Sequence, residues 1–212
     1  MHGTGFWWVI LSLAFYGIIH STLASLTWKG WVRRRVGVFR YNRFYRLFFN
    51  FMAAATITPA LVLVVLLPDE PLYTLRFPWL VLTGLIQLLA VLGLAAGVMQ
   101  TGGANFLGLE QLFQPEKAAQ PRRFVSGGLY RWVRHPLYFF SLLILWLFPV
   151  MSWNILAFNI GATLYLTIGS HFEERKLLIE FGERYAAYQR CTPMFIPLFR
   201  RKPCVGKETA GE

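Results

Sequence analysis

The chain has 212 residues, enough for one or two soluble domains or for one membrane-embedded bundle. Hydrophobic residues make up 56% of it and charged residues only 15%, against about a quarter charged in an average soluble domain, which argues against a soluble protein. The net charge of +11 does not indicate a nucleic-acid partner, because the basic residues lie between long apolar runs. We interpret them as determinants of membrane topology and as contacts for lipid headgroups.

The first three apolar runs predict three membrane-spanning helices. A spanning helix needs about 20 apolar residues. The runs at about Phe6–Leu26, Phe44–Leu67 and Trp79–Met99 meet that length and hold almost no ionisable residue before their ends.

The last apolar block, Leu137–Ser170, is too long for one helix. Pro149 followed by the Met-Ser-Trp-Asn sequence at 151–154 predicts a turn near a membrane surface. The turn divides the block into two helices, about Leu137–Phe148 and Ile155–His171, paired as a tight hairpin. At 1.5 Å per residue the first of them is only about 18 Å long, so it crosses part of the bilayer or tilts in a thinned one. The predicted fold is therefore an all-α membrane bundle of about five helices.

The distribution of Lys and Arg predicts the orientation of this bundle. Every one of these residues except Arg76 falls on the same side of the five helices. The positive-inside rule places that side in the cytoplasm, so the N-terminus lies outside and the C-terminal tail inside. We expect one membrane domain over 1–206, with three helices in 1–100 and the binding region in 101–200, followed by a disordered tail at 207–212.

Two polar stretches, 127–138 and 171–188, flank the predicted hairpin on its cytoplasmic side and are expected to meet there. Pro136 suits the first turn of a helix, whose free N–H groups favour an anionic group. Arg134 adds a guanidinium fork for a carboxylate. Glu173 and Glu174 are costly at a membrane boundary unless solvated or paired, and they suit a cationic ligand or ribose hydroxyl groups. Together these residues indicate a site for a zwitterion that also carries a positive centre.

The same stretches resemble the isoprenylcysteine carboxyl methyltransferase superfamily of membrane enzymes, which also includes phospholipid N-methyltransferases. The resemblance covers about Gly127–Pro197, roughly a third of the chain. It rests on RHPLY at Arg134–Tyr138, EERKL at Glu173–Leu177 and FGERYAAY at Phe181–Tyr188.

A second resemblance narrows the superfamily to its methanethiol S-methyltransferase and NnrU-like branch. It rests on FLGLEQ at Phe106–Gln111, WLFPVM at Trp146–Met151, and His20 followed by Ser. The chain departs from the superfamily pattern at Phe140, where a small residue is usual. This bulk is expected to reshape the cofactor cleft or the entrance for the substrate.

The resemblance implies an S-adenosylmethionine (SAM)-dependent methyltransferase. It also implies a location in a bacterial inner membrane, with the active site facing the cytoplasm. The residues implied at the cofactor site are Tyr130, Arg134, His135, Tyr138, Glu173 and Glu174. Those implied to position or deprotonate the acceptor are Arg184, Tyr188 and Arg190, with Tyr185 on the same helix face as Tyr188.

The chemistry is compatible with these residues. The sequence has no Rossmann glycine fingerprint and no zinc-protease motif, and no metal is predicted. Methyl transfer from a sulfonium is an in-line displacement that depends on a positioned acceptor and on exclusion of water. A small or lipophilic thiol is the favoured acceptor, through the branch resemblance alone; a carboxylate or an amine stays open, as does the oligomeric state.

Other interpretations remain for the same residues. Arg134 alone could be a topology anchor, the Glu pair could lie on a solvated face, and the tyrosines could belong to an interfacial belt. His20, His135 and His171 all fall near the cytoplasmic side, which leaves a non-catalytic haem-binding or cofactor-binding protein as an alternative. A small transporter is the third reading, disfavoured because the ionisable residues lie at helix ends and not at the midplane.

Overall fold

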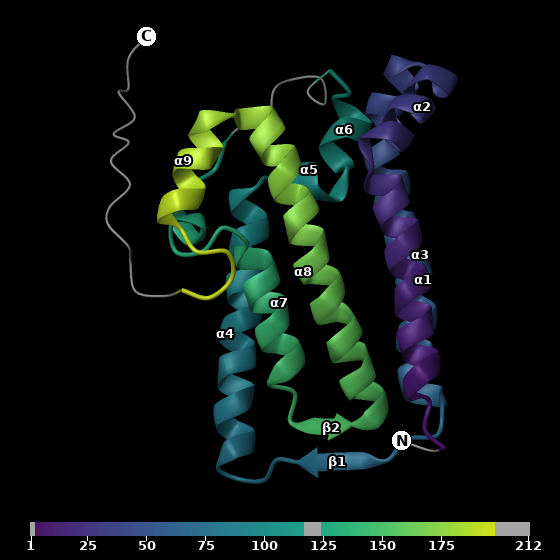
Figure 1. Cartoon of the computed structure of the whole chain (residues 1–212), viewed down its shortest axis with the longest axis vertical. Coiled ribbons are helices and arrows are strands. Elements are labelled where there is room, and N and C mark those ends of the chain that lie inside the picture. The colour runs from purple at the N-terminus through teal and green to yellow at the C-terminus, as the bar shows by residue number, and fades with distance from the viewer. Residues whose placement is uncertain (1–2, 117–123, 198–212) are drawn as a thin grey trace.

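The computed structural model describes residues 3–116 and 124–197 and shows an elongated helical bundle (Figure 1). The predicted disordered tail at 207–212 lies outside the described residues. The helices are α1 Phe6–Ala24, α2 Leu26–Val36, α3 Val38–Leu66, α4 Trp79–Gln100, α5 Gly103–Leu107, α6 Leu109–Phe113, α7 Pro136–Trp146, α8 Trp153–Phe181 and α9 Glu183–Cys191. A 3₁₀ turn, η2, covers Gly128–Arg131, and the two strands are β1 Pro71–Thr74 and β2 Val150–Ser152. The predicted all-helical class is confirmed.

Four helices of the described part, α1, α3, α4 and α8, are long and apolar enough to cross a membrane. The fifth predicted helix, α7, has only 11 residues. At 1.5 Å per residue it is about 16 Å long, roughly half of the apolar thickness of a bilayer. The prediction of a short fifth helix therefore agrees with the structure, whereas a count of five complete spans is not established.

Helix α8 extends ten residues beyond the predicted end at His171, to Phe181. The apolar pattern ends near Ser170, but Glu, Arg, Lys and Leu are good helix formers and continue the helix outside the apolar zone. It stops at Gly182, whose φ of 54° is a conformation that favours glycine. Glu173 and Glu174 therefore lie on a rigid helix.

Pairing of two short strands holds the end of the bundle that carries the N-terminus (Figure 1). Strands β1 and β2 are antiparallel, with Pro71 opposite Ser152 and Tyr73 opposite Met151. The residues predicted as a turn thus form a strand and then the start of α8. The Asn154 Nδ2 atom donates hydrogen bonds to the carbonyl groups of Leu67 and Pro68 at 3.3 and 3.2 Å, which connects α8 to the end of α3.

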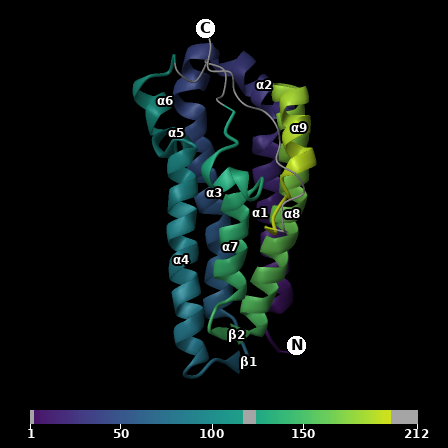
Figure 2. The ribbon, with the colours of Figure 1, turned by 90° about the vertical axis from the view of Figure 1, so that its left-hand side faces the viewer.

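Helix α7 packs chiefly against α4, and less extensively against α8, the predicted hairpin partner; Figure 2 shows it between the two. Gly93 and Gly97 of α4 allow this approach, since a Cβ atom at Gly93 would lie 2.4 Å from the Phe140 ring. The bulk of Phe140 is therefore accommodated by α4. Contact between α7 and α8 includes the hydrogen bond from Trp146 Nε1 to Thr163 Oγ1, at 2.9 Å.

The best-buried core lies between α1, α3 and α8, near the strand end. Its buried apolar residues are Phe6, Val9, Leu13, Ala60 and Ala157. At the opposite end the bundle carries the short elements α2, α5, α6 and α9 (Figure 1). The helix α2 was not predicted; the Ser25 side chain caps it by accepting a hydrogen bond from the Trp28 N–H group at 3.2 Å. Most basic residues of the described chain belong to this end.

Candidate active site

The start of α7 and the segment after α9 hold each other in place through backbone hydrogen bonds. The N–H group of Arg134 donates to the Pro193 carbonyl at 2.9 Å, and that of His135 donates to the Met194 carbonyl at 3.1 Å. His135 precedes Pro136, the first residue of α7, and has an extended φ of −123°. The chain that follows α9 therefore returns to the N-terminal end of α7 and forms one wall of the site.

Glu174 is the centre of a buried polar network, with 8% of its surface exposed. Its Oε1 atom accepts a hydrogen bond from Arg134 Nε at 2.6 Å and lies 3.1 Å from His135 Nε2. Its Oε2 atom accepts from Gln189 Nε2 at 2.8 Å. Arg134 also donates through Nη1 to the carbonyl groups of Gln189 and Thr192, at 3.1 and 2.6 Å. Arg134 and His135 precede α7, and Gln189 lies on α9. Glu174, on α8, therefore connects the start of α7 to α9.

Glu173, in contrast, faces outward, with 47% of its side chain exposed. Its Oε2 atom accepts a hydrogen bond from the Tyr138 hydroxyl group at 2.7 Å and lies 3.7 Å from His135 Nδ1. The imidazole of His135 thus lies between the two carboxylates. Glu173 is the carboxylate of this pair with room to contact a ligand.

Aromatic rings complete this side of the site. The rings of His135 and Tyr138 are stacked, with centroids 5.1 Å apart and planes 7° apart. The Phe195 ring lies 5.7 Å from that of His135 and 6.3 Å from that of Tyr138. A half-exposed carboxylate beside three aromatic rings suits a cationic ligand with a planar group, because ring faces attract cations and stack on planar groups.

The tyrosines of α9 lie on the inner face of that helix, as their spacing predicts. Tyr188 donates a hydrogen bond to the carbonyl group of Tyr130, and the Phe124 ring packs against both Tyr185 and Tyr188. The Tyr185 hydroxyl group is buried near Glu174 but makes no hydrogen bond within the described residues. Burial raises the pKa of Tyr185 and Tyr188 above the usual value, and it raises that of Tyr130 to about 12 with help from Glu173. These phenols stay protonated at neutral pH.

The two arginines predicted to position the acceptor lie apart from the Glu174 network. The guanidinium of Arg184 lies over the Phe124 ring, 4.8 Å from its centroid. Arg190 faces Glu183 at 4.0 Å, with 67% and 93% of the two side chains exposed. The structure thus brings together the six residues predicted for the cofactor around α7 and α8, whereas Arg184 contacts Phe124 and Arg190 is exposed beside Glu183.

Sequence reasoning missed Gln189 and Phe195, both of which contact residues of the network. Gln189 follows Tyr188 directly, and Phe195 lies between Pro193 and Pro197 in the part of the motif that received no role. Two prolines around a short apolar segment favour an extended chain, and this pattern could have indicated that the segment packs against the site.

The histidines considered as haem ligands have local contacts. The Nδ1 atom of His171 lies 2.7 Å from the Thr167 carbonyl oxygen, one turn earlier on α8. The ring of His20 lies among those of Tyr16, Phe49 and Tyr165, at 5.3, 4.6 and 5.7 Å. Among the residues that the structure describes, no three His, Cys, Asp or Glu side chains form a group that could hold a metal ion.

Comparison with known proteins assigns the chain to a defined family. Residues 29–192 match the family described as "Protein of unknown function (DUF1295)". The chain belongs to that family and, as the resemblance implied, to the isoprenylcysteine methyltransferase-like superfamily.

Three relatives illustrate the relationship. A methanethiol S-methyltransferase of Pseudomonas sp. (strain GM41(2012)) is 30% identical over 195 residues, which cover 87% of this chain and 70% of the relative. That of Crocosphaera subtropica is 36% identical over 100 residues, 46% of this chain and 39% of the relative. Human protein-S-isoprenylcysteine O-methyltransferase is 28% identical over 133 residues, 59% of this chain and 44% of the relative. The chain thus spans less than half of the length of two of these three relatives. No solved structure matches the chain.

Proposed function

We propose that the protein is an integral membrane methyltransferase that uses SAM to methylate a small or lipophilic acceptor. The observation that carries the proposal is the Arg134–His135–Glu174 network beside the half-exposed Glu173. It stands in a chain whose relatives are named methyltransferases.

The residues present fit SAM, which combines a carboxylate, an ammonium, a ribose and a sulfonium. Glu173 can accept hydrogen bonds from an ammonium or from ribose hydroxyl groups. The rings of Tyr138 and Phe195 offer faces for the adenine and the positive sulfur. The Tyr185 hydroxyl group supplies a polar atom without a partner among the described residues. Bound SAM supplies an electrophilic methyl group.

The role of the protein is to position the reactants and exclude water. The hydrogen bonds of Glu174 to three side chains hold the N-terminal end of α7 against α8 and α9. Such preorganisation aligns the acceptor with the methyl carbon, and an in-line displacement depends mainly on that alignment. Tyr188 is an unsuitable base in this scheme, because burial raises its pKa and its hydroxyl group donates to the Tyr130 carbonyl.

We favour a thiol as the acceptor and the inner membrane of a bacterium as the location. The thiol follows from the relatives named methanethiol S-methyltransferase; a prenylcysteine carboxylate is the second choice, from the human relative. The end of the bundle with α2, α6 and α9 carries the basic segments, so the positive-inside rule directs it and the site toward the cytoplasm, with the N-terminus outside.

Calorimetric titration of the purified full chain with SAM tests the proposal. We expect binding by the wild type, loss of binding in His135→Ala, and wild-type binding in Arg76→Gln, at the strand end. Transfer of a labelled methyl group to methanethiol and to a prenylcysteine then identifies the acceptor. A folded wild-type protein that binds no SAM would refute the proposal.

Absorption spectra of the same preparation address the alternative. A haem band that disappears in His20→Ala or His171→Ala would support a haem-binding protein.

A further inference from the structure

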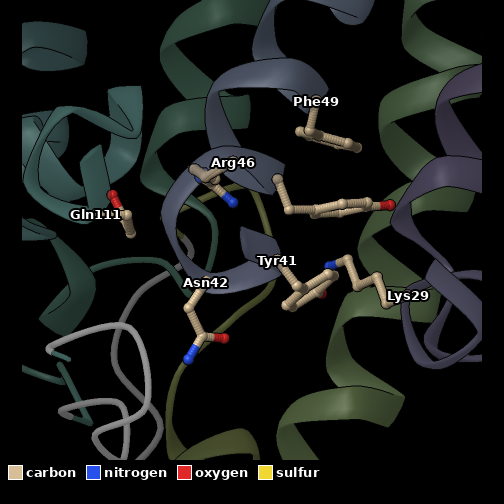
Figure 3. A pocket seen from close by; sticks show the side chains of 7 residues that line it. Lys29, Tyr41, Asn42, Arg46, Phe49 and Gln111 are labelled. Atoms are coloured by element: carbon tan, nitrogen blue, oxygen red, sulfur yellow. The ribbon is translucent and has the colours of Figure 1, made fainter. Parts of the chain in front are cut away.

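A separate pocket of about 140 Å³ lies at the same end of the bundle, between α2, α3 and α6 (Figure 3). It is lined by Lys29, Tyr41, Asn42, Tyr45, Arg46, Phe49 and Gln111. Helix α3 contributes five of these residues from one face, at the spacing expected for a helix. Among the residues that the structure describes, this lining contains two cations and no carboxylate.

The two cations meet across the pocket. The Lys29 ammonium lies 6.0 Å and the Arg46 guanidinium carbon 5.9 Å from the centroid of the Phe49 ring. Figure 3 shows both side chains pointing toward the middle of the pocket. Arg46 is held there by the hydrogen bond from its Nε atom to the Phe106 carbonyl, at 3.1 Å. Two cations in a concave, partly aromatic site attract an anion, and a phosphate group can contact both.

The wall opposite α3 contains a buried oxygen that has no hydrogen-bond donor in the described chain. Gln111 is 8% exposed; its Nε2 atom donates to Asn105 Oδ1 at 2.5 Å, whereas its Oε1 atom makes no hydrogen bond there. Such an atom is costly to bury alone. A ligand hydroxyl group would satisfy it.

This wall is formed by the FLGLEQ segment, Phe106–Gln111, on which the resemblance to the methanethiol S-methyltransferase and NnrU-like branch partly rests. Asn50 Nδ2 donates to the carbonyl groups of Phe106 and Leu107 at 3.0 and 2.8 Å. Gly108 allows the close approach, because a Cβ atom there would lie 2.9 Å from the Leu47 backbone nitrogen. The segment is therefore held against α3 by hydrogen bonds and close packing at the edge of the pocket.

The surroundings of the pocket are those of a membrane surface. Exposed apolar side chains cover the adjoining face of α3, among them Phe44, Phe48 and Phe51. Exposed Trp31 and the basic end of α2 lie nearby along the chain. Aromatic residues and cations at the end of a spanning helix are typical of the headgroup region of a bilayer.

We infer that the pocket binds a glycerophosphate group, carried by an anionic phospholipid. Lys29 and Arg46 would contact the phosphate, a headgroup hydroxyl would donate to Gln111 Oε1, and the acyl chains would lie along the exposed phenylalanines of α3. The inference does not depend on methyl transfer.

Native mass spectrometry of the full chain, with phosphatidylglycerol and phosphatidylcholine in competition, tests the inference. We expect the wild type to prefer phosphatidylglycerol, and Lys29→Gln and Arg46→Gln each to weaken its binding about tenfold. Arg40→Gln, the same charge change on an exposed residue of α3, should keep the preference. Equal binding of the two lipids by the wild type, or an unchanged preference in folded Lys29→Gln, would overturn the inference.

Two further measurements distinguish the headgroup and its source. Phosphatidic acid lacks the glycerol headgroup, so the wild type should bind it more weakly than phosphatidylglycerol, and Gln111→Leu should remove that difference. Glycerol 3-phosphate and inorganic phosphate should bind far more weakly than the lipid. If either binds as tightly as the lipid, a soluble phosphate is the ligand and the lipid assignment is wrong.

Discussion

Arg134 donates from Nε to Oε1 of Glu174 at 2.6 Å, across a separation of 40 residues. Only 13% of the Arg134 side chain and 11% of the Glu174 side chain are exposed. Glu174 has further partners in His135 and Gln189, so its carboxylate connects the helices. Glu173, whose side chain is half exposed, is the carboxylate that is open to a ligand.

Glu174→Gln should therefore destabilise the protein strongly. The change leaves Arg134 without its buried anionic partner, which costs about 3 kcal/mol in comparable pairs. The measurement is the free energy of unfolding in detergent. Glu180→Gln, on an exposed part of α8, should change it by less than about 0.5 kcal/mol. Equal effects of the two substitutions would contradict the assigned role.

Glu173→Gln should separate ligand binding from folding. Its side chain is half exposed, and within the described part of the chain its hydrogen-bond partner is Tyr138 alone, so the melting temperature should stay close to that of the wild type. Loss of the negative charge should weaken SAM binding about tenfold, the scale of one charged hydrogen bond. Calorimetry and thermal melting of the same preparation give both quantities. Unchanged affinity would exclude a ligand contact through this carboxylate.

Phe195→Ala should weaken SAM binding with a smaller effect on stability. The ring lies against those of His135 and Tyr138, and its removal opens the wall formed by the segment after α9. Ile196→Ala is the matched control, because its side chain is the next along the chain and is exposed. If both variants bind SAM alike, the Phe195 ring is not part of the ligand site.

Gly108→Ala should destabilise the contact between α6 and α3. The residue has a φ of +88°, and a Cβ atom would approach the Leu47 backbone nitrogen to 2.9 Å. Strain of this kind costs about 1–3 kcal/mol. In Gly84→Ala, on α4, the new Cβ meets nothing within 4 Å, so this control should be neutral or slightly stabilising. Thermal melting compares the two; equal melting temperatures would show that Gly108 tolerates a side chain.

Stability should fall at alkaline pH as the buried tyrosines ionise. Burial, then Glu173, raises the pKa of Tyr130 to about 12 from an unfolded value of about 10. The stabilisation from such a group is complete below the unfolded pKa and is lost as the pH rises through the folded pKa. The melting temperature should hence decrease above about pH 10, and less so in Tyr130→Phe. Identical pH profiles for variant and wild type would contradict the raised pKa.

The sequence by itself determined the helical class, the approximate place of each long helix and the family. Apolar runs of spanning length cannot be buried in a soluble core of this size, and the RHPLY and EERKL segments are local patterns that need no tertiary information. The end of α8 was missed, because apolar periodicity stops at Ser170 whereas helix propensity continues to Phe181.

Only the tertiary structure decided which carboxylate is enclosed and what encloses it. Glu173 and Glu174 are adjacent and chemically identical, but they point in different directions from α8. His135 lies between the two carboxylates, whereas Arg134 and Gln189 hydrogen-bond to Glu174. The same holds for Phe195, which reaches His135 through a reversal of the chain after α9. Contacts between residues far apart in the chain depend on how helices pack. Packing depends on matched residues such as Gly93, which has no side chain, and Phe140, whose ring fills that space.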